Sequence, residues 1–193
     1  MDTLAHLFEA HRIWVQTCGR MGKQICLDEQ DLRHLAFKDP MMSQSFLTVC
    51  RFSEVSFDQV DFYRSELYSC DFTGARFLNC DFCKATLDFS CFSDALFIDC
   101  HFNRTDVYQG IFKNCMFRNC AFSGLNLMKA DLQGAHFENI DFEDVYIDHS
   151  KMAGCHPVNP KNLHKAVKIN CSTDQRDLNP EGIDAIQALL ENT

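Results

Sequence analysis

The sequence has few of the features that identify enzymes, secreted proteins or membrane proteins. Among 193 residues there are 1 Trp, 4 Pro and 8 Gly, and there is no P-loop, G-x-G-x-x-G or G-x-S-x-G motif. No run approaches about 18 apolar residues, so no membrane span is expected. The N-terminal segment MDTLAHLFEAHRIWVQ lacks the basic region and apolar run of a signal peptide. We therefore expect a cytoplasmic, non-enzymatic protein without a cofactor, whose thiols are reduced.

The sequence also lacks an excess of positive charge. Its net charge is −9, and residues 27–153 alone carry 20 acidic against 11 basic side chains, which again gives −9. A nucleic-acid ligand requires a basic surface for its phosphates. Direct binding of nucleic acid is therefore not expected, and a protein partner is the better prediction.

What the chain has in abundance is Phe, with 18 residues, and Cys, with 12. Counting in fives from Leu32 to Met152 gives 25 positions, and all of them are apolar. A small side chain precedes most of them by two residues, and Asp often stands immediately before them, as at Asp71 and Asp81. A period of five stays in phase with neither a helix nor a strand. The pattern therefore predicts a structural repeat.

The pattern small–Asp–Phe/Leu–x–x resembles the pentapeptide-repeat family, whose consensus is A(D/N)Lxx. The resemblance implies an all-β solenoid: a right-handed quadrilateral β-helix with 20 residues per coil. The sequence independently shows a period of 20, because the column from Phe37 to Phe137 is Phe throughout, whereas the column from Leu47 to Ile147 contains no Phe. The repeats predict just over six coils, with a short capping α-helix at each end.

In this fold the central residue of each repeat and the small residue two places before it point inward. The expected core ladder is a stack of Phe side chains: Phe57, Phe72, Phe77, Phe82, Phe92, Phe97, Phe102, Phe112, Phe117 and Phe122. Six thiols take the small inward position and are interpreted as compact apolar residues: Cys50, Cys70, Cys80, Cys100, Cys115 and Cys120. Cys83 points outward, so it is not expected to share a metal with Cys80. A weak alternative metal site uses zinc-ligand types at a spacing of no common finger, namely Cys155, His156, His164 and Cys171.

Helices are expected at both ends of the solenoid. In residues 3–16 an apolar face recurs at helical spacing, formed by Leu4, Leu7, Phe8, His11, Trp14 and Val15. The following segment, with its His, Trp and two Gly, resembles the lead-in of bacterial pentapeptide-repeat proteins. Near the C-terminus, Asn179 and Pro180 start a helix that covers the last coil or pairs with a second chain through Ile183, Ile186, Leu189 and Leu190. The predicted domains are 1–26 (cap and lead-in), 27–154 (solenoid) and 155–193 (connector and C-terminal helix).

One side of the predicted solenoid combines acidic and aromatic side chains. The outward residues concerned are Glu66, Tyr68, Asp88, Phe89, Asp106, Tyr108, Tyr146 and Asp148. Aromatic residues supply interface energy and acids steer association, so a protein-binding surface is predicted. The alternative is that the aromatic rings only pack against their neighbours. A basic stripe of Arg64, Lys84 and Arg104 lies on a neighbouring edge, and Glu66 and Asp106 are expected to neutralise two of these charges.

Two functions remain open at this point. The chain resembles the quinolone-resistance and topoisomerase-poison immunity proteins of the family, which implies an acidic rod that dimerises through its C-terminal helix. Such a rod binds DNA gyrase or topoisomerase IV as a DNA mimic. Some members protect gyrase through projecting loops, and the repeats here contain no inserted loop. The alternative function is an interaction scaffold or effector module with a different protein partner.

Overall fold

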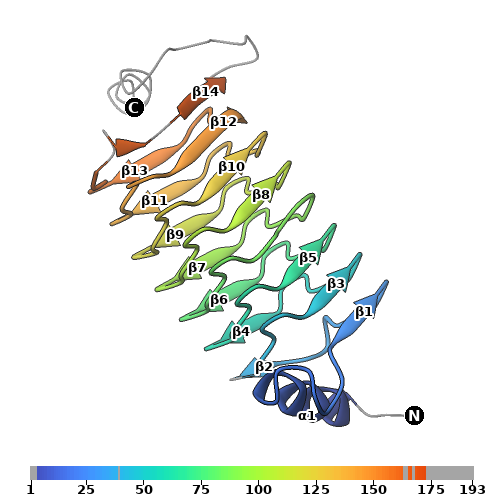
Figure 1. Cartoon of the computed structure of the whole chain (residues 1–193). Helices are drawn as coiled ribbons and strands as arrows, with labels where there is room; N and C mark the ends of the chain where they lie inside the picture. Colours follow the sequence, from blue (N-terminus) through green and yellow to red (C-terminus); the bar gives the residue numbers. More distant parts are fainter. Residues whose placement is uncertain (1–3, 39, 163–164, 167, 173–193) are drawn as a thin grey trace.

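A computed structural model describes residues 4–38, 40–162, 165–166 and 168–172 (Figure 1). Helix α1 (Leu4–Gln16) precedes a stack of short parallel strands. The strands are β1 (Cys26–Asp28), β2 (Phe37–Lys38), β3 (Phe46–Thr48), β4 (Ser56–Asp58), β5 (Glu66–Tyr68), β6 (Arg76–Leu78), β7 (Leu96–Ile98), β8 (Asp106–Tyr108), β9 (Met116–Arg118), β10 (Asn126–Met128), β11 (His136–Glu138), β12 (Tyr146–Lys151), β13 (His156–Val158) and β14 (Lys168–Ser172).

The strands form two opposite faces of a four-sided parallel solenoid (Figure 1). One face has the order β2-β4-β6-β7-β9-β11-β13. The other consists of β1-β3-β5 and β8-β10-β12-β14, and Thr86 joins these halves by bridging to Glu66 and Asp106. The remaining two faces are held by single bridges between residues 20 apart, such as Asp61 with Asp81. The predicted 20-residue coil and quadrilateral β-helix are thus confirmed.

The solenoid has about seven turns, compared with the predicted just over six. Its first strand begins at Cys26, before the first regular repeat, and its last strands lie beyond residue 154. β13 pairs with β11, and β14 pairs with β12 across a register shift. Part of the segment expected to be a connector therefore continues the stack. The predicted C-terminal helix lies outside the described residues.

Each corner of the solenoid is made by a residue in the left-handed conformation. From Gln44 to Asn159 every fifth residue has a positive φ, including Val49 (φ 52°) and Phe89 (φ 61°). For residues other than Gly this conformation costs roughly 1–2 kcal/mol. The stacking offsets it, because most corner amides donate to the next coil, as Val49 N does to Tyr68 O at 3.0 Å.

The core consists of columns of Phe rings that stack from coil to coil. Phe77 lies between Phe57 and Phe97, with ring centroids 4.7 Å apart on both sides and planes within 5°. The structure buries all ten Phe residues of the expected core ladder. The stack changes at Phe122, whose ring is turned 87° from that of Phe102.

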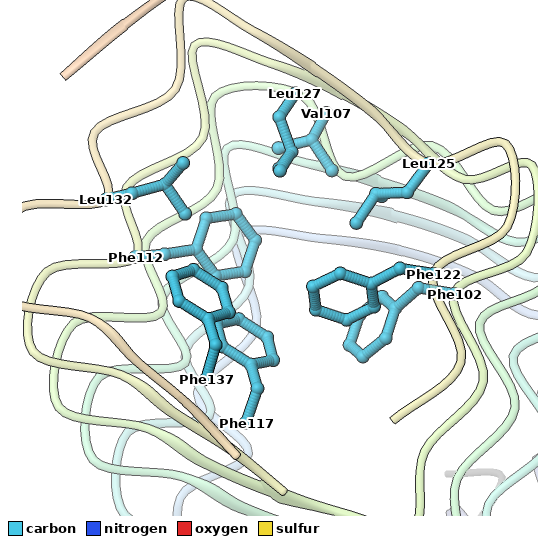
Figure 2. Close-up of a pocket in the computed structure, with 9 residues that line it drawn as sticks. All are labelled: Phe102, Val107, Phe112, Phe117, Phe122, Leu125, Leu127, Leu132 and Phe137. Atoms are coloured by element: carbon cyan, nitrogen blue, oxygen red, sulfur yellow. The ribbon is translucent and has the colours of Figure 1, made fainter. Parts of the chain in front are cut away.

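A small cavity of about 10 Å³ lies where the Phe stack changes (Figure 2). Leu125 occupies a position that holds Cys, Ala, Ser or Thr in many other repeats, and Leu132 stands in the column of Phe112. The side chains around the cavity are entirely apolar: Phe102, Val107, Phe112, Phe117, Phe122, Leu125, Leu127, Leu132 and Phe137. A space of this size holds about one water and offers it no polar partner. The cavity is therefore a packing defect rather than a substrate site.

The small inward positions combine compact volume with a hydrogen bond. Ser90 Oγ accepts from Cys70 N at 2.9 Å and donates to Leu67 O at 2.8 Å. The six inward thiols are buried in the same way, and Cys80 Sγ contacts Phe57 O at 3.6 Å. Burial raises the pKa of the Cys100 and Cys115 thiols, so they stay protonated. The interpretation of these cysteines as core residues is supported by their position.

Helix α1 covers the first coil, as predicted for residues 3–16 (Figure 1). Leu7 and Phe8 pack against the core, and the Phe8 ring meets Phe37 edge-on at 5.8 Å. His11 is fully buried: Ile25 N donates to its Nδ1 at 2.9 Å, and its Nε2 contacts Ser43 O at 3.0 Å. The helix is thus fastened to two segments of the solenoid. Within the described residues, no helix is long and apolar enough to cross a membrane.

The lead-in after α1 depends on Gly22, which has φ +78°. A Cβ atom at this position would lie 2.2 Å from Ala10 O. The close approach allows Lys23 N to donate to Ala10 O at 3.0 Å. The His, Trp and Gly residues noted in the sequence therefore act together to hold the N-terminal helix against the first coil.

Candidate functional site

The acidic and aromatic residues singled out in the sequence lie on one face, built on β3, β5, β8, β10 and β12. In most of these strands the central residue is buried and its two neighbours point outward, because successive side chains alternate. The register places Glu66, Thr86 and Asp106 in one outward column, continued by Asn126 and Tyr146. We call this surface the acidic–aromatic face. It comprises Glu66, Tyr68, Asp88, Phe89, Asp106, Tyr108, Tyr146 and Asp148, together with Phe46 and Val49 described below.

Exposed apolar side chains gather on this face. Six large hydrophobic residues are exposed in the described part of the chain, and four of them lie here: Phe46 (37%), Val49 (51%), Phe89 (50%) and Tyr146 (42%). Sequence reasoning missed Phe46 and Val49. Both could have been found by the period of 20, because Phe46 stands one coil before Glu66 and Val49 two coils before Phe89.

The aromatic rings of the face are partly held by one another. Phe89 meets Tyr108 edge-on at 5.5 Å, and Phe46 lies 5.9 Å from Tyr68. Lys129 Nζ donates to the Tyr108 hydroxyl at 3.1 Å and lies 5.1 Å from the centre of its ring. The expectation that aromatics pack on their neighbours therefore describes Tyr68 and Tyr108, whereas half of Phe89 remains open to solvent.

The acids of the face are close to the rings. Tyr108 N donates to Asp88 Oδ1 at 2.8 Å, which fixes this carboxylate beside the tyrosine. Burial raises the pKa of Asp88, and the Asp106 carboxylate adds to this, while the bond from Tyr108 N opposes it. Burial, Glu66 and Asp88 together raise the pKa of the Tyr68 hydroxyl. The carboxylates of the face thus lie directly beside its aromatic rings.

The neighbouring basic stripe is not neutralised as expected. In the described part of the chain, no ion pair involves Arg64, Lys84 or Arg104. Lys84 Nζ instead donates to the Tyr63 hydroxyl at 3.1 Å and lies over the Tyr63 ring at 5.3 Å. All three cations stand at corners with positive φ. The rod therefore has an acidic side and a basic edge.

The other candidate residues are not brought together. Cys155 is buried and its Sγ donates to Leu132 O at 3.1 Å, whereas His156 is exposed, so the two point to opposite sides of the wall. Burial raises the Cys155 pKa to about 12. His164 and the side chain of Cys171 lie outside the described residues, as do Ile183, Ile186, Leu189 and Leu190. Within the described ranges, no three His, Cys, Asp or Glu residues form a group that could hold a metal.

Among solved structures, the chain is similar to a trypsin-treated variant of QnrB1, described as a plasmid-mediated fluoroquinolone resistance protein. The identity is 17%, the match covers 86% of this chain and 74% of that one, and the TM-score is 0.48. HetL, involved in heterocyst differentiation regulation in the cyanobacterium Nostoc, is 14% identical over 86% and 98% of the chains, with a TM-score of 0.32. A pentapeptide repeat protein of the Arabidopsis thaliana thylakoid lumen is 18% identical over 64% and 68%, with a TM-score of 0.18. At these TM-scores the similarities carry no argument about function.

Two family models match the repeats directly. One, described as a pentapeptide repeat region, matches residues 90–159, and the other, described as pentapeptide repeats in eight copies, matches residues 50–88 and 65–104. Together they span residues 50–159, which is more than half of the 193 residues. No curated protein matches the chain. The repeat pattern, the four-sided solenoid and these two models show that the chain belongs to the pentapeptide-repeat family.

Proposed function

We propose that this chain is a non-enzymatic protein-binding rod that docks through its acidic–aromatic face. The observation that carries the proposal is the gathering of exposed apolar side chains on this one face, among carboxylates. A patch of exposed aromatic residues with charges around it is typical of a protein interface. The ladder of backbone bonds holds these side chains in place before binding, which reduces the entropy lost on association.

We further propose that the partner is the DNA-binding surface of DNA gyrase or topoisomerase IV, which the rod occupies as a DNA mimic. About seven turns at ~4.8 Å each give a length of roughly 34 Å. A net charge of −9 over this length is one charge per ~4 Å, against one per ~1.7 Å in B-DNA. The sign is that of DNA at about half its charge density. Because Arg64, Lys84 and Arg104 are basic, the mimicry is confined to the acidic–aromatic face.

The test is a DNA gyrase supercoiling assay, with and without a fluoroquinolone, into which the purified protein is titrated. Wild type is expected to inhibit supercoiling or relieve drug-induced cleavage at micromolar levels, with an effect that weakens as salt rises. The double variant Asp88→Asn/Asp106→Asn is expected to lose this effect at least tenfold. The Asn at position 88 still accepts the bond from Tyr108 N, so the change removes charge while keeping the local geometry.

The matched control is Asp58→Asn/Asp99→Asn, which removes the same charge from the opposite face. Asp58 lies in β4 and Asp99 directly follows β7. Equal losses in both double variants would mean that net charge matters and the face does not. No effect of wild type up to tens of micromolar would exclude the topoisomerase and favour a scaffold with a different partner. Sedimentation of the full chain and of Leu189→Glu tests the dimer that the family resemblance implies.

A further inference from the structure

A pair of histidines stacks on the face opposite the acidic–aromatic face. His136 in β11 and His156 in β13 are partners in the parallel register, because they are 20 residues apart. Their ring centroids lie 4.7 Å apart, and both side chains are exposed. The ring planes are inclined by 32°, whereas the stacked Phe57 and Phe77 planes in the core differ by only 5°. The two imidazoles are therefore adjacent but not parallel.

Two adjacent, exposed imidazoles can chelate a metal ion. Neutral imidazole is the commonest protein ligand for first-row transition metals. An ion bound to two ring nitrogens at about 2.0–2.1 Å requires these nitrogens to be about 3 Å apart. From a centroid separation of 4.7 Å, exposed rings reach this distance by modest rotations about χ2, a torsion with a broad minimum.

The surroundings of the pair favour a cation. Arg118, in the neighbouring strand β9, donates from Nε to Glu138 Oε2 at 2.6 Å, and its Nη2 lies 3.9 Å from Met116 Sδ, so its charge is engaged with a carboxylate. Met116 in β9 is the register partner of His136 on its other side, so a thioether continues the column. Since the face is open to solvent, water can complete the coordination.

We propose that His136 and His156 form a surface site for a divalent transition-metal ion of the Ni²⁺, Cu²⁺ and Zn²⁺ group. Two imidazoles from adjacent coils are the protein ligands, and water fills the remaining positions. These ions lead the affinity order for nitrogen ligands. The partner of His156 in this site is His136, and not Cys155 as the sequence suggested. His136 lies one coil away in the same outward column, whereas Cys155 points into the core. It is independent of the proposed topoisomerase binding, which uses the opposite face.

The test is isothermal titration calorimetry of the untagged full chain with NiCl₂ at pH 7.5. Ni²⁺ is the probe because, unlike Cu²⁺, it does not oxidise the exposed thiols of Cys18 and Cys26. Wild type is expected to bind one ion, and the binding constant is expected to fall at least tenfold in both His136→Asn and His156→Asn.

The control is His101→Asn, an exposed histidine whose register partners are Asp81 and Ala121, and this variant is expected to bind as wild type does. Circular dichroism checks that each variant keeps the solenoid. A loss in His156→Asn alone would overturn the pair in favour of ligands from the C-terminal segment. A double variant, His136→Asn/His156→Asn, completes the set, and wild-type heats equal to those of this variant would overturn the site altogether.

Discussion

Replacing His11 by Ala is expected to loosen the N-terminal cap. Ile25 N–H can only donate and Ser43 O can only accept, so Nδ1 of the buried ring is the acceptor and Nε2 carries the proton. The Ala variant leaves the Ile25 N–H without an acceptor, which costs about 1–3 kcal/mol. The lost bond to Ser43 adds about 1 kcal/mol. The expected loss of stability of the cap is therefore about 2–4 kcal/mol.

The same histidine gives the cap a dependence on pH. Burial lowers the pKa of His11, against the bond to Ser43 and the charge of Asp61, which raise it. Above about pH 6.5, the usual value, the ring is neutral in the folded and the unfolded chain, and the stability is fully present. Below this pH the unfolded chain binds a proton that the folded chain excludes. Stability then falls by up to about 1.4 kcal/mol per pH unit until the folded pKa is reached.

Trp14 is the single Trp of the sequence, and its ring stacks on His11 with centroids 5.7 Å apart. Its fluorescence therefore reports whether the N-terminal helix is docked. Urea unfolding of wild type and His11→Ala is compared at pH 7.5 and pH 5. The difference between them is expected to shrink at pH 5, since only wild type carries the titrating ring. A difference that is the same at both pH values would refute the reasoning, as would a cap in His11→Ala as stable as that of wild type. Hydrogen exchange at Ile25 N–H gives an independent local readout.

Three further predictions concern the lead-in, the core and the thiols. Gly22→Ala places a Cβ 2.2 Å from Ala10 O, so Trp14 fluorescence is expected to show an undocked cap at neutral pH. Phe77→Ala removes a ring stacked on both sides and is expected to cost about 3–5 kcal/mol, measured by chemical denaturation; a cost below about 1 kcal/mol would mean that the columns are not close-packed. An alkylating reagent is expected to label the exposed thiols Cys18 and Cys26 in the native protein. The six buried thiols are expected to react only after urea is added: Cys50, Cys70, Cys80, Cys100, Cys115 and Cys120.

The fold could be predicted because the sequence has two periods, one of five residues and one of 20. The period of five fixes which side chains point inward, and the period of 20 fixes which ones stack. The left-handed corners could not be predicted from residue type, since Val49 and Phe89 are poor candidates for a positive φ. They adopt it because stacked backbone bonds outweigh a local preference. The stack extends past the regular repeats at both ends, because β1 begins before the first of them and β13 and β14 pair with β11 and β12 after the last.

The candidate site could be predicted only for residues that were compared at the spacing of 20, which places them in one column. The repeat pattern grouped Glu66 with Asp106 correctly by face. It also led us to expect that these two acids neutralise two of the three basic residues of the stripe, and it gave no sign of Tyr63 as the partner of Lys84. It also read Cys155 and His156 as neighbours. Cys155 takes an inward position of the wall and His156 an outward one, and the outward neighbour of His156 in the next coil is His136, 20 residues away.

The 20-residue register has a consequence for how such a rod changes length. Removing or duplicating 20 residues shortens or lengthens the stack by one coil and leaves every later column on its original face. Removing five residues instead turns everything that follows by a quarter of a turn, which would move Tyr146 away from the column of Glu66 and Asp106. The length of the rod and the composition of its faces can therefore change independently, and a rod that lengthens by whole coils keeps the same side chains on each face.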